Sequence, residues 1–170
     1  MIAYWSTQDT PIGTFTSVID ADDAVLASGW TDDVTELTSV VAPALRPSAL
    51  RHRADLGAVT KAVHRYHHGE LHAVDEIAVR QQSGPFLRHA WDVLRTVPAG
   101  KPVTYSEFAA LSGRPAAIRA AAAACARNAA ALFVPCHRVL RIGGALGGFR
   151  WGLDVKRWLL DHESPTCHEN

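Results

Sequence analysis

The sequence predicts an α+β protein in which an antiparallel sheet is followed by a mainly helical half. β-Branched and aromatic residues alternate through the first thirty positions around a turn at Pro11-Ile12-Gly13, a pattern typical of antiparallel strands. Beyond residue 84, apolar residues instead recur every three or four positions, which is the spacing of helices. With 170 residues, 48% of them hydrophobic, the chain can bury a substantial core.

Short strands and one helix are expected in the first half. The Pro43 to Pro47 stretch predicts a linker, because prolines interrupt regular structure. A helix is expected after this linker, ending near Gly69, from the apolar spacing of Leu56, Val59, Val63 and Tyr66. The strands are expected at 3–6, 14–19, 25–30 and 77–79.

The composition changes at Ser83-Gly84-Pro85, and we place a domain boundary there. The predicted domains are a supporting domain at 1–83 and a second domain at 84–165, with a tail at 166–170. The second domain should begin with a helix, because five apolar residues fall on one face. These residues are Phe86, Leu87, Ala90, Trp91 and Leu94.

The next two helices form a candidate helix-turn-helix. Thr104 and Glu107 have the spacing of a capping box, which predicts a helix from there to Leu111. Gly113 would end it, and Pro115 suits the first turn of an alanine-rich helix running to about Arg127. So many alanines indicate either tight helix packing or close approach to a ligand. The arginines at 114, 119 and 127 favour a nucleic-acid surface.

A short buried strand is expected at Leu132-Phe133-Val134, followed by Pro135-Cys136-His137-Arg138 and a second strand at Val139-Leu140. Four glycines between 143 and 148 predict a loop. The last helix would point Leu153, Trp158 and Leu159 inward and carry Glu163 near its end.

Charge is distributed unevenly along a chain whose net charge is zero. Up to Ser83 there are six Lys/Arg against eleven Asp/Glu, a balance of −5. From Gly84 onward there are eleven against six, a balance of +5. A polyanion is therefore a plausible partner of the second half only, although a solvated basic face would explain the charge equally well.

Three cysteines, at 125, 136 and 167, make an odd count, and no basic-apolar leader is visible, so free thiols in a reducing cytoplasm are expected. No apolar stretch approaches the roughly 20 residues needed to span a bilayer.

Cys136 stands beside His137 and Arg138, and basic neighbours lower a thiol pKa from about 8.5 toward a nucleophilic thiolate. A buried structural cysteine is the alternative interpretation, and we adopt it for Cys125 and Cys167.

The run Val134-Pro135-Cys136-His137-Arg138-Val139 resembles the reactive-site signature of the 6-O-alkylguanine-DNA alkyltransferases, or methylated-DNA-protein-cysteine methyltransferases. The resemblance covers roughly residues 85–163 and includes Tyr105, Arg119, Asn128 and Glu163 at the family's spacings. Within the family, Gly148-Phe149-Arg150-Trp151-Gly152 and Ala124-Cys125-Ala126 are most similar to the C-terminal domain of the Ada adaptive-response protein.

The resemblance implies a ribonuclease H-like first domain and a winged helix-turn-helix-like second domain. It implies direct-reversal DNA repair in a single turnover, in which Cys136 irreversibly takes the alkyl group of 6-O-methylguanine, and of 4-O-methylthymine, after base flipping. His137, oriented by Glu163, would activate the thiol through a water. Tyr105 would supply a proton to the leaving guanine, and Asn128 would brace the turn before the reactive segment.

The resemblance also implies the DNA contacts. Arg119 would replace the extruded base, with a simple phosphate contact as the alternative. The other expected DNA-binding residues are Arg114, Arg127, Ala120, Ala123 and Arg138. The expected pocket residues are Phe149, Arg150, Trp151 and Val139.

Two positions depart from many relatives, since Phe149 replaces a tyrosine and Ala129 a proline. The bulk of Arg150 and Trp151 puts large alkyl groups and free-base inhibitors in doubt.

Double-stranded DNA containing alkylated guanine is the expected partner of a monomer, with no membrane association, and cooperative binding along DNA is left open. No cofactor is expected. His64, His67, His68 and His72 could hold a metal, but without a nearby cysteine we expect a solvated histidine-rich surface and no metal.

Three other interpretations stay open. A lesion sensor would lack the reactive cysteine, a helix-turn-helix transcription factor leaves Glu163 unexplained, and a cysteine hydrolase needs an oxyanion hole that we cannot locate.

Overall fold

The computed structural model describes residues 1–165, which form two compact units. The first unit contains residues 1–82 together with Ala129–Phe133. The second contains Ser83–Asn128 and the chain from Val134 onward. A single boundary near residue 83 was expected, whereas the structure assigns a five-residue stretch of the second half to the first unit.

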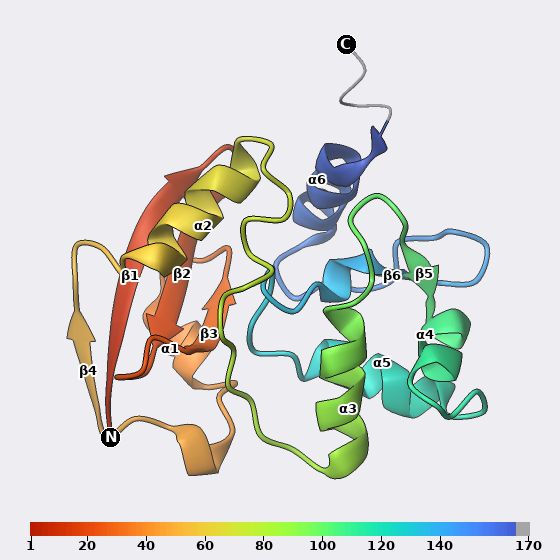
Figure 1. The fold of residues 1–170 in the computed structure, drawn as a ribbon, viewed down its shortest axis with the longest axis horizontal. Helices are drawn as coiled ribbons and strands as arrows, with labels where there is room; N and C mark the ends of the chain where they lie inside the picture. Colours follow the sequence, from red (N-terminus) through yellow and green to blue (C-terminus); the bar gives the residue numbers. More distant parts are fainter. Residues whose placement is uncertain (166–170) are drawn as a thin grey trace. The chain divides into compact units, whose positions relative to one another are not determined.

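A four-stranded sheet forms the centre of the first unit, in the order β3-β2-β1-β4 (Figure 1). Strands β1 (Ile2–Thr10), β2 (Gly13–Ile19) and β3 (Val25–Gly29) pair antiparallel, as predicted. Strand β4 (Ala49–His52) pairs parallel to β1, so the prediction of a purely antiparallel sheet was wrong. The chain between β3 and β4 crosses to the far edge of the sheet, and β4 itself lacks the alternation that would have indicated a strand.

Two helices and a short turn complete the first unit. Helix α1 (Val34–Thr38) and a 3-10 turn at Pro43–Leu45 form the crossover to β4. Helix α2 (Ala58–His67) lies along the sheet and contacts β1 (Figure 1). Its buried face carries Val59, Ala62, Val63, Tyr66 and His67, which includes three of the four residues predicted for it.

Helices make up most of the second unit. Helix α3 (Pro85–Leu94) buries Ala90, Trp91 and Leu94, as its spacing predicted. Helices α4 (Tyr105–Leu111) and α5 (Ile118–Ala126) pack against each other, and α3 packs against both. The Thr104–Glu107 capping box is confirmed. The Trp91 indole N–H donates to the Ala124 carbonyl over 2.9 Å and ties α3 to α5.

The second unit also contains a two-stranded parallel sheet and a last helix. Strands β5 (Val103–Thr104) and β6 (Val139–Leu140) pair beside the 3-10 turn at Cys136–Arg138. Helix α6 is Leu153–Glu163. None of the helices in the described part of the chain has the length and apolar character needed to cross a membrane.

Three local predictions in the second half were wrong. Helix α5 begins at Ile118, so Pro115 lies in the preceding turn and not in the helix. Leu132 and Phe133 form a buried turn and not a strand, with Leu132 at φ 78°. Leu153 is 47% exposed, because the buried stripe of α6 begins one turn later at Lys156.

Gly100 provides a test of the packing at the end of α6. It has φ +80°, and a Cβ there would lie 2.7 Å from the backbone oxygen of Glu163. Gly113 has φ +88°, and a Cβ at that position would meet nothing within 4 Å. We expect Gly113→Ala to cost about 1–2 kcal/mol for the left-handed backbone alone. Gly100→Ala should cost clearly more, because it adds a steric clash. If urea denaturation shows that Gly100→Ala and Gly113→Ala lower the free energy of unfolding equally, this packing is contradicted.

Candidate functional site around Cys136

Cys136 begins the 3-10 turn, and its side chain is almost fully buried. Its backbone N–H donates to the Val134 carbonyl over 2.8 Å. The Asn128 amide donates to the same carbonyl, also over 2.8 Å, and hydrogen-bonds the Cys136 side chain. Asn128 therefore fixes both the turn before the cysteine and the surroundings of its sulfur.

The two residues after Cys136 converge on Glu163, the last residue of α6. His137 Nε2 lies 2.8 Å from Glu163 Oε2. The Arg138 guanidinium donates to both oxygens of the same carboxylate, over 2.8 and 2.9 Å, and to the Val97 carbonyl over 2.8 Å. All three side chains are buried. The result is an ion-paired network inside the protein, adjacent to the thiol.

The charges of this network fix the state of His137. Burial alone would favour a neutral Glu163, but the electrostatic interaction and hydrogen bond with His137, together with the hydrogen bonds and charge of Arg138, hold the pKa of that carboxyl well below its usual range. Burial lowers the pKa of His137 and outweighs the opposing effect of Glu163. Because an ionised carboxylate only accepts hydrogen bonds, the neutral imidazole carries its proton on Nε2.

The other imidazole nitrogen is therefore an unprotonated base. His137 Nδ1 is buried and has no hydrogen-bond partner among the described residues. A buried polar atom in this condition is costly unless a mobile group or water uses it. It belongs to the residue directly after Cys136.

The prediction that basic neighbours lower the pKa of Cys136 was wrong. Burial raises the pKa of this thiol, and the opposing effects of Asn128, Lys156 and Arg150 are smaller. Arg138, the adjacent cation in the sequence, is neutralised by Glu163 and does not act on the sulfur. In the free protein the cysteine is therefore a thiol, and deprotonation needs a base.

Lys156 belongs to the site and was missed by sequence reasoning. Its side chain is completely buried, and Nζ donates to the Val139 carbonyl over 2.9 Å. Burial lowers the pKa of Lys156, and Cys136 raises it. A signal was present in the sequence, because Lys156, Leu159 and Glu163 share one helical face. The ammonium group thus fastens α6 to the strand that follows the reactive turn.

Tyr105 is the first residue of α4 and is half-buried. Burial raises the pKa of Tyr105 to about 12, with further contributions from Cys125 and Cys136. The phenol is therefore protonated at neutral pH and can donate. A methyl group on Gly147 would lie 3.3 Å from the Tyr105 hydroxyl, which places the glycine-rich loop against this side chain.

Cys125 lies in α5, and burial raises its pKa, which ionisation of Cys136 would raise further. The structural role expected for Cys125 stays a prediction. Cys167 lies outside the described residues.

The residues expected to contact DNA are placed as follows. Arg119 and Arg127 are exposed at the start and end of α5, and Ala120 and Ala123 are partly exposed on the same helix. Arg114 is exposed in the turn between α4 and α5, with its guanidinium 5.0 Å from the Phe86 ring centroid. Arg138, also expected to contact DNA, has a buried guanidinium that is committed to Glu163 and Val97, which does not favour that contact.

Three of the four expected pocket residues lie in the loop before α6, and the fourth, Val139, lies in β6. Val139 is buried in β6, and Phe149 and Trp151 are partly exposed. The Arg150 guanidinium donates to the Asn128 carbonyl over 3.1 Å and to the Ala126 carbonyl over 2.5 Å. A cation at the C-terminal end of α5 is favourable, so Arg150 links its loop to that helix.

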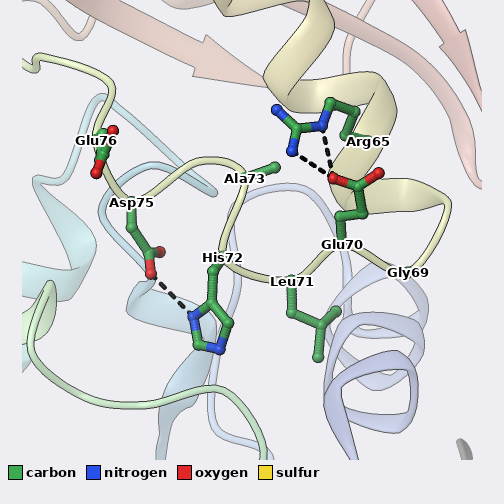
Figure 2. Close-up of a pocket in the computed structure, with 8 residues that line it drawn as sticks. All are labelled: Arg65, Gly69, Glu70, Leu71, His72, Ala73, Asp75 and Glu76. Carbon is green, nitrogen blue, oxygen red and sulfur yellow. Dashed lines mark hydrogen bonds and ion pairs between the residues drawn. The ribbon is translucent and has the colours of Figure 1, made fainter.

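The histidine-rich part of the first unit has other contacts. His67 is buried and accepts from the Trp30 indole N–H over 3.3 Å. Figure 2 shows the hollow beside α2, in which Arg65 faces Glu70 and His72 faces Asp75. Within residues 1–165, no group of three His, Cys, Asp or Glu side chains lies together so as to hold a metal ion.

Comparisons with known proteins show which family the chain resembles. A family model described as 6-O-methylguanine DNA methyltransferase, DNA binding domain, matches residues 85–165. A methylated-DNA–protein-cysteine methyltransferase of Shigella flexneri is 30% identical over 91% of this chain and 91% of its own length. The chain belongs to this family.

A further relative and a solved structure show how much of the chain the similarity covers. The bifunctional transcriptional activator and DNA repair enzyme Ada of Escherichia coli is 47% identical over 81 residues, which are 48% of this chain but only 23% of Ada. The crystal structure of Mycobacterium tuberculosis OGT in complex with DNA has a TM-score of 0.78 at 26% identity, covering 94% of this chain and 92% of that one. The mixed α+β architecture is thus that of the family.

Glu163→Gln tests the buried network. The substitution leaves the buried Arg138 guanidinium without a counter-charge, so we expect the free energy of unfolding to fall by about 3 kcal/mol or more. The loss in the free energy of unfolding should become smaller as the pH falls. Because the pKa of Glu163 is lowered by folding, its contribution is complete above the unfolded pKa of about 4.3 and disappears as the pH falls through the folded pKa.

Urea denaturation of wild type and variant between neutral and acid pH provides the measurement. Asp161→Asn, which neutralises an exposed acid on the same helix, is the control and should change stability by less than about 0.5 kcal/mol. A gap between wild type and Glu163→Gln that stays constant down to strongly acid pH would exclude an ionised Glu163.

Proposed function

We propose that this protein repairs DNA directly, by moving the alkyl group of 6-O-methylguanine irreversibly to Cys136. The observation that carries the proposal is the state of His137. Its Nε2 is committed to Glu163, and its unprotonated Nδ1 is buried without a partner among the described residues, on the residue that directly follows Cys136 in the sequence.

The thiol is activated by proton transfer to this imidazole. Residues adjacent in sequence seldom bond directly, so a bridging water carries the proton from Cys136 Sγ to His137 Nδ1. The resulting imidazolium is stabilised by the Glu163 carboxylate, which Arg138 keeps ionised. Because burial disfavours the thiolate, the thiolate forms as the reaction needs it and is not the resting state.

The thiolate then attacks the alkyl carbon in line with the bond to the guanine oxygen. The carbon–oxygen bond breaks as the carbon–sulfur bond forms, and negative charge develops on the guanine. Tyr105, protonated at neutral pH because its pKa is about 12, donates a proton to the leaving base and regains one from solvent. The product thioether has no activated bond for water to hydrolyse, so each molecule acts once.

DNA binding is assigned to the second unit, through α4 and α5 as a helix-turn-helix of winged-helix type. The small residues on α5 would let its backbone approach the minor groove closely. Arg119 would enter the base stack in place of the flipped guanine, and Arg114 and Arg127 would contact phosphates. The first unit would be ribonuclease H-like, and the protein would act as a monomer without a cofactor.

Intact-protein mass spectrometry tests the transfer. After mixing with a duplex that carries one 6-O-methylguanine, we expect wild type to gain the mass of one methylene group per molecule, and Cys136→Ala to gain none. Cys125→Ala is the matched control, because it removes the neighbouring thiol and should still accept the group. Binding of the lesion without any gain in mass would instead identify a damage sensor.

Arg119→Ala tests base flipping. The variant should transfer the methyl group more slowly from a duplex, by at least tenfold, since extrusion of a base costs a few kcal/mol that the arginine offsets. Its transfer rate from a single-stranded oligonucleotide should change little, because no base pair has to open. Arg88→Ala, an exposed arginine on α3, serves as the control. Equal slowing on both substrates would indicate a phosphate contact.

A further inference from the structure

The acidic first unit holds one short part of the second half of the chain. Residues Ala129–Phe133 belong to it, while the residues on either side belong to the second unit. The two flanking residues are Asn128 and Val134, which are joined by the hydrogen bond of 2.8 Å described above. Val134 is two positions before Cys136. The segment is therefore a loop whose two ends meet beside the reactive turn.

Ser28, in strand β3 of the first unit, holds this segment at two points. Its backbone N–H donates to the Ala129 carbonyl over 2.9 Å, and its hydroxyl donates to the Ala131 carbonyl over 2.7 Å. Ser28 and Ala130 also form an isolated parallel bridge. Ser28 itself is completely buried, so water cannot replace the hydroxyl if it is removed.

Gln81 holds the same segment at its first residue. The Gln81 side-chain oxygen accepts from the Ala129 backbone N–H over 2.9 Å. All five residues of the segment are at most 4% exposed, and Leu132 adopts φ 78°, which is uncommon for a residue with a side chain. A conformation of this kind persists only where the surroundings impose it.

We propose that Ser28 and Gln81 are positioning residues for the alkyl transfer assigned to Cys136. They fix the Ala129–Phe133 segment, and this segment sets the separation and orientation of Asn128 and Val134. Asn128 contacts the Cys136 side chain and favours its ionised form. The first unit therefore acts on the chemistry through this one segment, in addition to any contribution to stability. The inference rests on the proposed function.

Four variants test the proposal. Ser28→Ala removes the bond to Ala131, and Gln81→Ala removes the acceptor for Ala129. Gln81→Glu is the conservative counterpart, because it keeps an oxygen in the same place. Ser6→Ala is the matched control: Ser6 lies on β1, two strands from Ser28, and its hydroxyl donates to the Ala54 carbonyl over 3.2 Å and not to the segment.

The measurements are the dissociation constant for a methylated duplex and the single-turnover transfer rate at saturating duplex across pH. Ser28→Ala and Gln81→Ala should transfer at least tenfold more slowly at neutral pH with unchanged affinity, since small displacements of reacting groups have effects of this size. Their rate profiles should move to higher pH, because the thiolate loses support from Asn128. Ser6→Ala and Gln81→Glu should behave as wild type.

A second measurement separates this inference from the proposed function. The rate at which iodoacetamide modifies Cys136 in the protein without DNA, located by peptide mass spectrometry, should show the same shift to higher pH. If wild type fails to transfer the methyl group, the proposed function is wrong, and this profile still decides whether the two residues position Cys136. Should Ser28→Ala not fold, Gln81→Ala and Gln81→Glu decide. Profiles equal to those of Ser6→Ala overturn the proposal.

Discussion

The site depends on one ionised carboxylate inside the protein. Glu163 is buried at the end of α6 and would be neutral in these surroundings without its partners. Arg138 supplies the counter-charge, and the fold supplies Arg138 with a further acceptor at Val97. Once the carboxylate is charged, the tautomer of His137 follows. A single ion pair, between Glu163 and Arg138, thus fixes the protonation state of His137. Burying this ion pair costs free energy, which explains why both oxygens of the Glu163 carboxylate accept hydrogen bonds, from three donors in all.

Glu163 stays ionised although it is buried, whereas burial keeps Cys136 in its neutral, protonated form. An activated thiolate that is permanently present would be open to oxidation and to stray electrophiles, and a protein that reacts once cannot recover from either. Burial keeps this thiol protonated, while the proposed base, His137, is already hydrogen-bonded to its carboxylate partner, Glu163. Burial therefore keeps the fraction of reactive thiolate low in the free protein.

Local patterns in the sequence predicted those features that depend on neighbouring residues. The capping box at Thr104 and the buried face of α3 follow from spacing alone. Arg138 gives no such local signal, because an isolated arginine in a sequence is expected to be exposed, and Lys156 gives one only through the helical spacing that it shares with Leu159 and Glu163. Both are buried through partners that lie 25 residues away, in Glu163, and 17 residues away, in Val139. Strand β4 was missed for a related reason, since its pairing with β1 is set by the crossover and not by its own composition.

The route of the chain explains why these distant partners can act together. A reactive turn on an ordinary surface loop would move by more than a methyl transfer tolerates. Here the segment before it is buried within the first unit, the turn is capped by Asn128, and the strand after it is fastened by Lys156. Each attachment comes from a different part of the sequence, so no single helix or strand defines the position of Cys136. Both halves of the chain therefore contribute to the position of the Cys136 sulfur, although only the basic second half is proposed to bind DNA.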